Sequence, residues 1–495
     1  MKKTNIITLV LLFSTLANLS ACGMKGSDGN ESTTATATAT DTESADTTTA
    51  VETGRDSISD DLPDVNYGGA VFTILDRTDL DYEFAAEEEN ADLMNDAIYR
   101  RNAAVEDRFG VDIQTYPLPC AWGDQATAFN NTLRSSIMAG DSAFDLVAGY
   151  AATIPGLVSE SLFVNWRELS YIDLSKPWWS SLLADDLTIN GKDYMISGDI
   201  SLSLWEFMTC MFFNKRLADS YDTGDIYGLV NEGGWTFDKL IELTKNVYQD
   251  IDGDGKKSVG DSYGLLMGWA TDIDSLKEAF EIHVTEKGDD GFPKITLINE
   301  RTAEAVTKIN DYIYNNNGVF GVYANSDNDL ENMFRNGQGL FYTAYLGRSE
   351  KLRDMSDDFG IIPYPKYDEK QENYHSTSLD GFSLFVLPMD AKDKEMSSII
   401  TEALCAESYK KVVPVFYDTV LKIKMARDDV SSQMIDLIRD NLTFDFGYLH
   451  SNSIGGVGHL FVGWIRDNNN NIVSSYEKKQ NTIEKQLNNV LEVYR

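Results

Sequence analysis

Apolar runs of strand length alternate with longer segments of helical spacing in the N-terminal half of the chain. The runs are Ala70–Leu75, Val111–Thr115 and Phe144–Tyr150, and amphipathic segments at 93–109 and 129–138 separate them. Strands that alternate with helices pair mainly in parallel, because the chain needs a crossover connection to return to the same end of the sheet. The pattern therefore predicts an α/β fold with a mainly parallel sheet.

The length and charge of the chain limit the class of protein. At 495 residues it is too long for one ordinary hydrophobic core, and a hydrophobic content of 42% is that of a globular protein. The formal net charge of −37 repels nucleic-acid phosphates and anionic membrane surfaces. We therefore expect a globular protein with two lobes that does not bind nucleic acid.

Four residues stand at the ends of the first and third predicted strands: Asp76, Arg77, Gly149 and Tyr150. In open α/β sheets, ligands bind outside the carboxyl ends of the strands, so these residues are candidates for ligand contact. One alternative remains open for the first pair. Asp76 could cap the following segment, and Arg77 could pair with it on the surface.

Two adjacent tryptophans, Trp178 and Trp179, point in different directions on most backbones. An exposed indole face can stack on the apolar face of a pyranose ring, which makes Trp179 a further candidate for ligand contact. Burial of both rings in a core is the more common outcome for such a pair.

The middle of the chain holds a specific order of signals. An apolar run of strand length, Met208–Phe213, is followed by Asn214 and Lys215. Thr236, in the sequence Gly-Gly-Trp-Thr, is suited to cap a helix, and apolar residues recur at helical spacing from Phe237 to Tyr248. The order predicted is strand, loop and amphipathic helix, and the helix leads directly into an acidic loop.

This order resembles the centre of extracellular solute-binding proteins that feed ABC importers. The resemblance is strongest to the large branch that includes the maltose-binding type, and by pattern it extends from about Tyr67 to the C-terminus. It implies a two-lobed, periplasmic-binding-protein-like (type II) α/β fold with a hinge and an interlobe cleft. It also implies a monomeric binding protein, not an enzyme, that delivers its solute to ABC permease subunits.

The resemblance adds further candidates for ligand contact. Trp205 lies where the family's chain first crosses between lobes, and Glu206 beside it could accept hydrogen bonds from hydroxyl groups. The family's chain returns near Tyr345 and Arg348, where aromatic residues meet sugar. Asp380 could place a carboxylate in the cleft, and a plain turn is an equal alternative.

The resemblance also implies lobes that are discontinuous in sequence. Lobe 1 would comprise residues 64–203 plus 342–384, and lobe 2 would comprise 204–341 plus 385–495. The strands that cross between the lobes would form the hinge, and a ligand that contacts both lobes would favour the closed arrangement.

The N-terminus has the pattern of a secretory signal. Two lysines precede the apolar run Ile6–Leu16, and the sequence Leu19-Ser-Ala-Cys22 resembles a bacterial lipobox. We expect residues 1–21 to be a lipoprotein signal peptide and Cys22 to carry acyl chains such as palmitate, which anchor the protein outside the cell membrane. The alternative is an ordinary signal peptide with an incidental cysteine. Residues 22–63 are rich in Ser, Thr and Ala and are expected to form a flexible tether.

An acidic loop begins at Asp250 and fits the calcium-loop template, in which carboxylates converge on one cation and a glycine at position six makes the turn. Position twelve is Asp where Glu is usual, and a metal-free polar turn is the alternative. Closely spaced carboxylates repel one another unless a cation neutralises them, so we expect a structural Ca²⁺. Its predicted ligands are Asp250, Asp252, Asp254, Lys256 (carbonyl), Ser258 and Asp261.

The resemblance implies that the solute is a carbohydrate, in particular an oligosaccharide, and the 8 Trp, 24 Tyr and 23 Phe of the chain could stack on sugar rings. A peptide is an alternative, because Arg77 or Arg348 could bind its carboxylate. A polyamine would need several acids, which the chain also has. A secreted carbohydrate-active enzyme, with two spaced carboxylates, and a surface scaffold without a ligand are further alternatives. No organic cofactor is expected.

Overall fold

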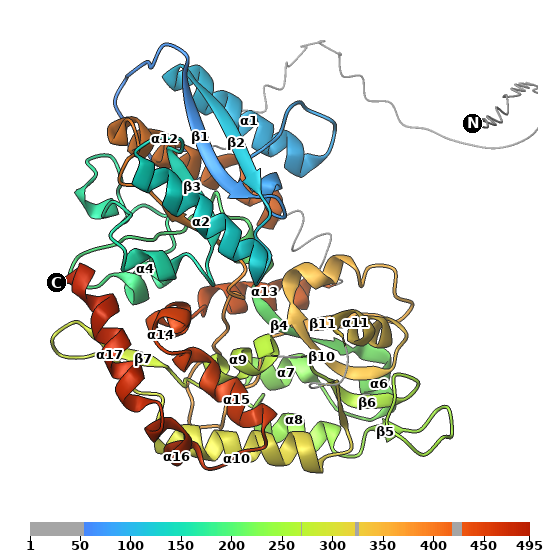
Figure 1. Ribbon diagram of the computed structural model, residues 1–495. Coiled ribbons are helices and arrows are strands. Elements are labelled where there is room, and N and C mark those ends of the chain that lie inside the picture. The colour runs from blue at the N-terminus through green and yellow to red at the C-terminus, as the bar shows by residue number, and fades with distance from the viewer. Residues whose placement is uncertain (1–53, 269, 322–325, 418–427) are drawn as a thin grey trace, which may run out of the picture. The chain divides into compact units, whose positions relative to one another are not determined.

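The first sheet contains the strands that alternate with helices near the start of the fold (Figure 1). In this computed structural model residues 54–268, 270–321, 326–417 and 428–495 are described. The strand order is β12–β3–β1–β2, with β1 parallel to both neighbours and β12 antiparallel to β3. The prediction of a mainly parallel sheet is confirmed. The strands are β1 (Ala70–Arg77), β2 (Val111–Leu118), β3 (Leu146–Tyr150) and β12 (Ser383–Val386).

The two faces of this sheet are covered by different helices. Phe72 and Ile74 alternate along β1 and share a buried cluster with Phe109 of α1 (Leu93–Phe109) and with α12 (Lys394–Glu407). Leu75 points to the other face and shares a cluster with residues of α2 (Asp124–Ala139). This alternation follows from the two-residue period of a strand.

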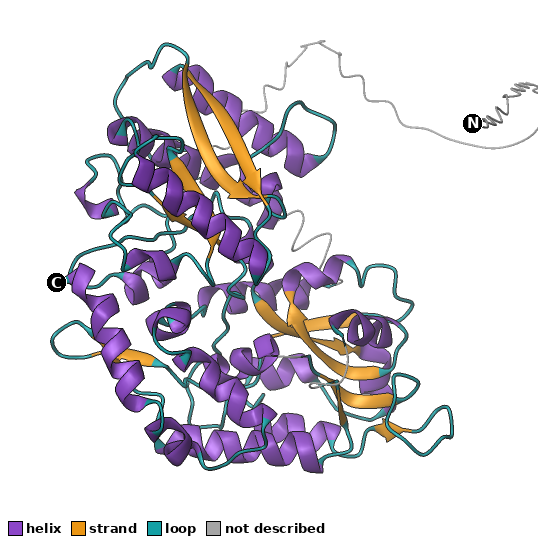
Figure 2. Ribbon diagram, in the orientation of Figure 1, coloured by secondary structure: helices purple, strands orange, loops and turns teal. Residues whose placement is uncertain are grey.

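A second, mixed sheet has the strand order β11–β4–β10–β6–β5, with β9 also paired to β6. Figure 2 shows its strands in orange, flanked by helices. Phe212 of β4 and Tyr342 of β10 are buried in its core, with ring centroids 6.1 Å apart. The strands are β4 (Thr209–Asn214), β5 (Tyr248–Gln249), β6 (Ser262–Leu266), β9 (Val319–Phe320), β10 (Gly339–Tyr345) and β11 (Phe359–Ile362), and β7 (Thr285–Lys287) with β8 (Pro293–Ile295) forms a separate hairpin.

Helices connect and cover these sheets, and the C-terminal part of the fold is mainly helical. Thr236 caps α8, since its side chain accepts a hydrogen bond from the Lys239 amide at 3.3 Å. This helix ends at Thr244, and Tyr248 begins β5, so the predicted helix to Tyr248 is too long. The remaining helices are α3 (Pro155–Val158), α4 (Ser181–Leu187), α5 (Ser203–Glu206), α6 (Lys215–Ser220), α7 (Ile226–Asn231), α8 (Phe237–Thr244), α9 (Ala270–Ala279), α10 (Glu300–Asn315), α11 (Asp327–Arg335), α13 (Asp429–Asp440), α14 (Phe446–Leu449), α15 (Leu460–Arg466), α16 (Ile472–Glu477) and α17 (Gln480–Leu491).

The strand pairing corrects the predicted lobe boundaries. The resemblance implies that segment 342–384 belongs to the first lobe, but β10 pairs with β4 and β6, and β11 pairs with β4, all in the second sheet. The chain rejoins the first sheet only at Ser383, and α12, assigned to the second lobe, packs against α1. The reason is that β10 is apolar and buried along almost its whole length, which suits a central strand with neighbours on both edges.

The N-terminal boundary of the fold also differs from the prediction. Residues 1–53, which include the predicted signal peptide and Cys22, lie outside the described residues. Arg55 donates a hydrogen bond to the Tyr409 carbonyl at 3.0 Å, and Asp60 pairs with Arg108. The predicted tether to residue 63 is therefore too long, because 55–62 pack on the first sheet's helices. In the described part of the chain, no helix combines the length and apolar character that crossing a membrane requires.

A buried carboxyl group joins two of the segments that cross between the sheets. Glu83 is fully buried, and its carboxylate accepts hydrogen bonds from the Ser203 amide and from the Ser383 hydroxyl, both at 2.6 Å. The Ser203 hydroxyl in turn accepts a bond from the Ser383 amide at 3.1 Å. Ser203 precedes β4 and Ser383 begins β12, so Glu83 fixes the two crossing segments against each other.

This arrangement predicts a pH-dependent contribution to stability. Burial raises the pKa of Glu83 to about 7, although the hydrogen bonds from Ser203 and Ser383 oppose the shift. A carboxyl whose pKa is raised on folding stabilises the folded state most at low pH and loses that contribution as the pH rises through its folded pKa. The free energy of unfolding of the native protein should therefore fall relative to that of E83Q, by on the order of 3 kcal/mol at most, between about pH 5 and pH 8. Chemical denaturation across this range measures the difference, and parallel pH profiles would contradict it.

Candidate functional site

Loops and helices that pack beside the two sheets line a pocket of about 400 Å³. A volume of this size is in the range of small-molecule sites. The residues that line it are far apart in the sequence and belong to both lobes, so we call it the interlobe pocket. Its lining residues are Trp122, Tyr150 and Asp380 beside the first sheet, and Ala270, Thr271, Asp274, Tyr448, His459, Val462, Gly463 and Arg466 from the helices associated with the second.

The pairing of β3 with β12 builds the wall on the side of the first sheet. Tyr150 ends β3 and lies opposite Ser383 in the antiparallel register. The chain just before Ser383 therefore runs past Tyr150, and the Asp380 carbonyl accepts a hydrogen bond from the Ala152 amide at 3.0 Å. Trp122 stands between β2 and α2, at the same edge of the sheet. Tyr150, which was named because it stands at a strand end, therefore lines this pocket.

Two helices supply most of the opposite wall. α9 contributes Ala270, Thr271 and Asp274, and α15 contributes Val462, Gly463 and Arg466. Both sets have the spacing i, i+1, i+4, which places them on one face of a helix. α9 and α15 pack against each other, and Tyr448 of α14 donates a hydrogen bond to the Asp274 carboxylate at 3.2 Å.

Four rings form a connected aromatic frame around the interlobe pocket: Tyr150, Trp122, His459 and Tyr448. The Trp122 ring lies 6.3 Å from Tyr150 and 6.5 Å from His459, and His459 lies 6.2 Å from Tyr448, each pair edge to face. The Trp122 side chain is 60% exposed. The frame thus crosses from one lobe to the other and presents indole and phenol surfaces to a solute, which suits stacking on sugar rings.

Two carboxyl groups lie inside this frame. Burial raises the pKa of Asp380 to about 6, although the Arg77 guanidinium opposes the shift. Burial also raises the pKa of Asp274 well above its ordinary value, although the nearby Lys277 ammonium opposes the shift. Both groups can accept hydrogen bonds from a solute.

The residues predicted at the end of β1 support the site without lining the pocket. Asp76 is fully buried, and burial together with the neighbouring Asp81 raises its pKa to about 8. Arg77 bonds the Gly381 carbonyl, pairs with Asp79 and stacks on Tyr150, with the guanidinium 4.4 Å from the ring centre. Arg77 therefore holds Tyr150 and the segment of Asp380 in place, and it does not pair with Asp76 at the surface.

Gly149, also predicted to contact ligand, lies inside β3 against the Ile154 side chain. A Cβ at this position would be 2.2 Å from Ile154 Cγ1, so the glycine leaves room for that side chain. Its role in the structure is this close packing, which places the chain after β3.

Four other predicted ligand contacts lie close to one another but do not line the interlobe pocket. They are Trp205, Glu206, Tyr345 and Arg348. Glu206 accepts a hydrogen bond from the Tyr82 hydroxyl at 2.5 Å, and Trp205 is half-buried against the main core. Tyr345 packs on Phe207, and Arg348 pairs with Glu331 at 3.1 Å and stacks on Tyr345. The crossing segment connects this group to the pocket, because the Leu379 amide bonds the Phe207 carbonyl.

The proposal of Trp179 as a ligand contact is wrong. Both Trp178 and Trp179 are buried, and their indole nitrogens donate to the same carboxylate, Glu402, at 2.7 and 3.0 Å. A buried indole needs a hydrogen-bond acceptor, and Glu402 provides one for both. The pair is a structural feature of the first sheet's core.

Sequence reasoning missed Trp122, Asp274, Tyr448 and His459. Trp122 follows β2, so the rule that named Tyr150 could have named it too. The other three residues lie on or beside helices that follow Trp122 by more than a hundred residues in the sequence. No local pattern indicates that they face a pocket.

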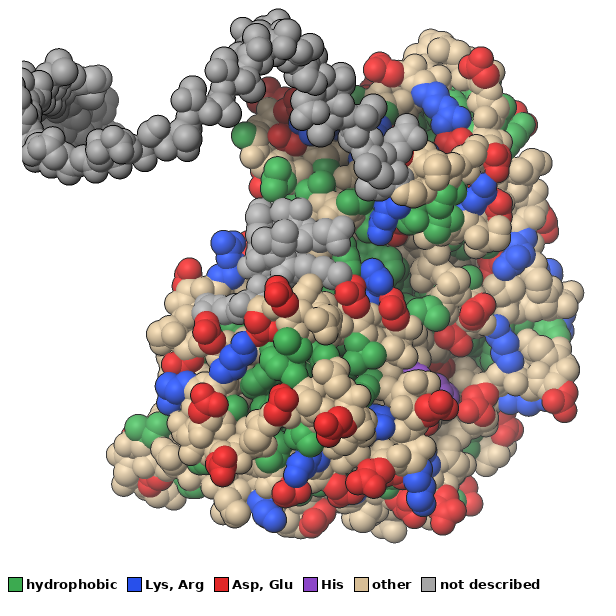
Figure 3. Space-filling model, turned by 180° about the vertical axis from the view of Figure 1, so that it is seen from behind, with side chains coloured by type: hydrophobic (Ala, Val, Ile, Leu, Met, Phe, Trp, Pro, Cys, Tyr) green, Lys and Arg blue, Asp and Glu red, His purple; other side chains and the backbone are tan. Residues whose placement is uncertain are grey.

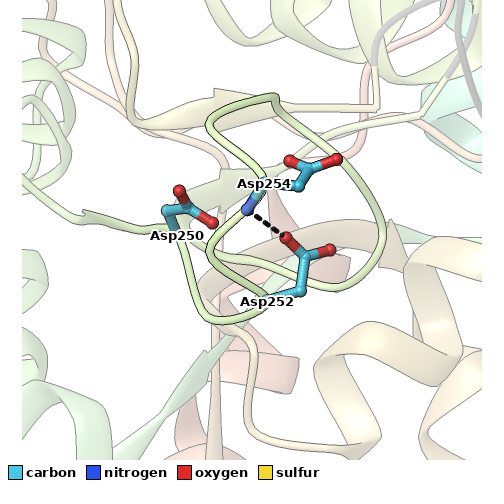
Figure 4. A group of neighbouring side chains, drawn as sticks. All are labelled: Asp250, Asp252 and Asp254. Atoms are coloured by element: carbon cyan, nitrogen blue, oxygen red, sulfur yellow. Dashed lines mark hydrogen bonds between the residues drawn. The ribbon is translucent and has the colours of Figure 1, made fainter.

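The predicted calcium loop connects β5 and β6, and Figure 4 shows three carboxylates in its first half, Asp250, Asp252 and Asp254. One oxygen from each of Asp250, Asp252 and Asp254 lies within 4.8 Å of the others. Gly255 adopts a φ of 73°, as the sharp turn requires. Asp261 is buried, and its two oxygens accept bonds from the Ile251 and Ser258 amides, which closes the loop.

Comparison with known proteins places this fold. It is similar to that of a cyclo/maltodextrin-binding protein complexed with maltotetraose, with a TM-score of 0.54, 12% sequence identity, and coverage of 86% of this chain and 96% of that chain. It is also similar to the GacH receptor of Streptomyces glaucescens, with a TM-score of 0.51, 12% identity, and coverage of 86% and 98%. A search of curated proteins gave no match. The two-lobed fold of solute-binding proteins is thereby confirmed.

The sequence model of one family, described as bacterial extracellular solute-binding protein, matches residues 120–413. The match covers more than half of the chain and includes Trp122, Tyr150 and Asp380 of the interlobe pocket. The protein therefore belongs to the bacterial extracellular solute-binding proteins. It is a binding protein and not an enzyme, as the sequence resemblance implied.

Proposed function

We propose that the protein is the solute-binding component of an ABC importer and that it captures a carbohydrate, in particular an oligosaccharide, in the interlobe pocket. The aromatic frame is the main support for this proposal, because Trp122, which is exposed, and Tyr448 both line the pocket. Asp274 and Asp380 add acceptors for hydroxyl groups. Proteins of the same fold have been observed with maltotetraose and with acarbose, which favours a sugar.

Capture follows from the placement of the pocket walls. Trp122 and Tyr150 belong to the first lobe, and Asp274 and Tyr448 belong to the second. A solute that contacts both walls binds more tightly when the lobes are close together, and this difference in affinity shifts the protein toward the closed form. The closed, loaded protein is the form that we propose the permease subunits receive.

The attachment to the cell also belongs to this proposal. Cys22 and the Ser/Thr/Ala-rich residues after it lie outside the described residues, and the lipobox-like sequence supports lipidation at Cys22. Two or more acyl chains on one cysteine give stable membrane attachment. The protein would then act as a monomer held at the outer face of the membrane.

A panel of sugars, peptides and polyamines tests the proposal by thermal unfolding and by titration calorimetry. A sugar that binds only the folded state raises the unfolding midpoint. Trp122→Ala should lower the affinity for that sugar at least about tenfold, because the aromatic contact and the apolar area that it buries are lost.

Trp179→Phe is the matched control. It should lower the unfolding midpoint, because the Glu402 carboxylate loses a buried donor, and leave the dissociation constant unchanged. A panel in which no sugar binds, or a Trp122→Ala variant that keeps full affinity, would contradict the proposal.

We further propose that Ca²⁺ holds the loop between β5 and β6. The three carboxylates and the glycine turn support it, because oxygen ligands in this spacing suit a hard cation. Asp250, Asp252 and Asp254 would supply the carboxylates, with further oxygens from Lys256, Ser258 and Asp261.

Calcium should raise the unfolding midpoint of the native protein by mass action, and Asp252→Ala should abolish the rise. The exposed Asp289, which lies in the β7–β8 hairpin, gives a matched control, and Asp289→Ala should keep the full response. Equal responses in the native protein and Asp252→Ala would exclude the ion from this loop.

A further inference from the structure

Acidic groups in the interlobe pocket are not balanced by available basic groups. Asp274 and Asp380 both line the pocket, where the basic lining residues are Arg466 and His459. Arg466 donates to Asp467 at 2.8 Å, so its charge is matched outside the pocket. Burial and the nearby Lys277 lower the pKa of His459, which keeps its ring neutral at neutral pH.

Two further cations lie behind the walls, and each has its own acidic partner. Lys277 is fully buried and pairs with Glu278, while its ammonium lies 5.1 Å from the ring centre of Tyr448. Arg77 pairs with Asp79 at 2.5 Å. The cations that interact with Asp274 and Asp380 are therefore each shared with another acid, and they stand behind the pocket walls.

Asp274 also has an unused acceptor. Its side chain is 5% exposed, and among the described residues its Oδ1 atom has no hydrogen-bond partner, while Oδ2 accepts a bond from Tyr448. A buried acceptor without a donor is costly, and a group that donates to it from within the pocket removes that cost. A sugar hydroxyl could donate there, but an ammonium group donates and also favours the ionised form of the carboxyl group.

The aromatic frame adds a second feature that favours a cation. Tyr150, Trp122 and Tyr448 surround the two carboxyl groups, and aromatic faces attract ammonium groups through their negative π-surfaces. Aromatic rings together with carboxylates are the chemistry that recognises a protonated amine. The acidic surface, of which Figure 3 shows one face, would also favour the approach of a cation.

We propose that the solute carries a protonated amine, which binds between Asp274 and Asp380 inside the aromatic frame. The inference rests on the proposed function, since it specifies the solute of the same pocket as an amino-bearing saccharide. A polyamine shares this chemistry and is the other source that the experiment must distinguish.

Binding of such a solute is coupled to proton release. Asp380 faces Arg77, Tyr150 and Tyr448, and Asp274 faces Lys277, Glu278, Asp380 and Tyr448. Burial raises the pKa of Asp380 to about 6, so part of this group is protonated in mildly acidic solution. An ammonium favours the carboxylate, so affinity should rise with pH through about 6 and protons should leave on binding.

Calorimetry of the full chain with matched ligands tests the proposal. Chitobiose carries free amines, and its N,N′-diacetyl form has the same rings without the charge; spermidine carries amines without a ring. At about pH 6, we expect chitobiose to bind at least tenfold more tightly than the diacetyl form. Heats measured in buffers of different ionisation enthalpy should show protons released with chitobiose and none with the diacetyl form.

Two pocket variants and one control complete the test. Asp380→Asn should reduce the preference for chitobiose at least about fivefold, and Asp274→Asn should do the same if it folds. Asp107→Asn, at an exposed position on α1, should change nothing. Equal or tighter binding of the diacetyl form, or an unchanged preference in Asp380→Asn, would overturn the inference and leave the proposed sugar function standing. If only spermidine binds, the protonated amine is supported and the assignment of the solute as a saccharide is overturned. If none of the three ligands binds, both parts of the inference are overturned.

Discussion

The antiparallel pairing of β12 with β3 is the contact on which the site depends. It joins Ser383 to Tyr150, and the strands of the second sheet all lie between these two residues in the sequence. The pairing brings Asp380 beside Tyr150, and Glu83 then fixes the returning segment to the outgoing one through Ser383 and Ser203. One hydrogen-bonded strand pair thus completes the first sheet, defines the crossing segments and forms one wall of the interlobe pocket.

Sequence patterns were sufficient to predict the strands and helices that depend on residues close together in the sequence. The strand period and helical spacing gave β1 to β3, α1 and α2, and the Thr236 cap was visible because capping depends on one side chain and the next turn. The choice of partner strand was not visible. The resemblance places the chain from Tyr342 onward, and so the end of β10, in the first lobe, whereas pairing with β4 and β6 places the whole strand in the second.

In the candidate site, too, the residues set by local sequence could be predicted and those set by distant contacts could not. Tyr150 was predicted because the carboxyl end of a strand is a position that sequence can locate, and Trp122 could have been found in the same way. Asp274 and Tyr448 could not, because the packing of α9 against α15 and α14 places them, and that packing joins distant segments. Trp179 was misplaced because its partner Glu402 lies on α12, far along the chain. Arg77 and Gly149 act behind the surface, where they hold Tyr150 and its strand in position.

Binding of a solute between the two lobes, within the aromatic frame, is the proposal from which the others follow. A crystal structure of the protein with its bound solute tests this most directly. We expect the solute to contact Trp122 and Tyr150 on one side and Asp274 and Tyr448 on the other. A solute bound instead beside Glu206 and Tyr345, or in the groove between the β7–β8 hairpin and α17, would contradict it.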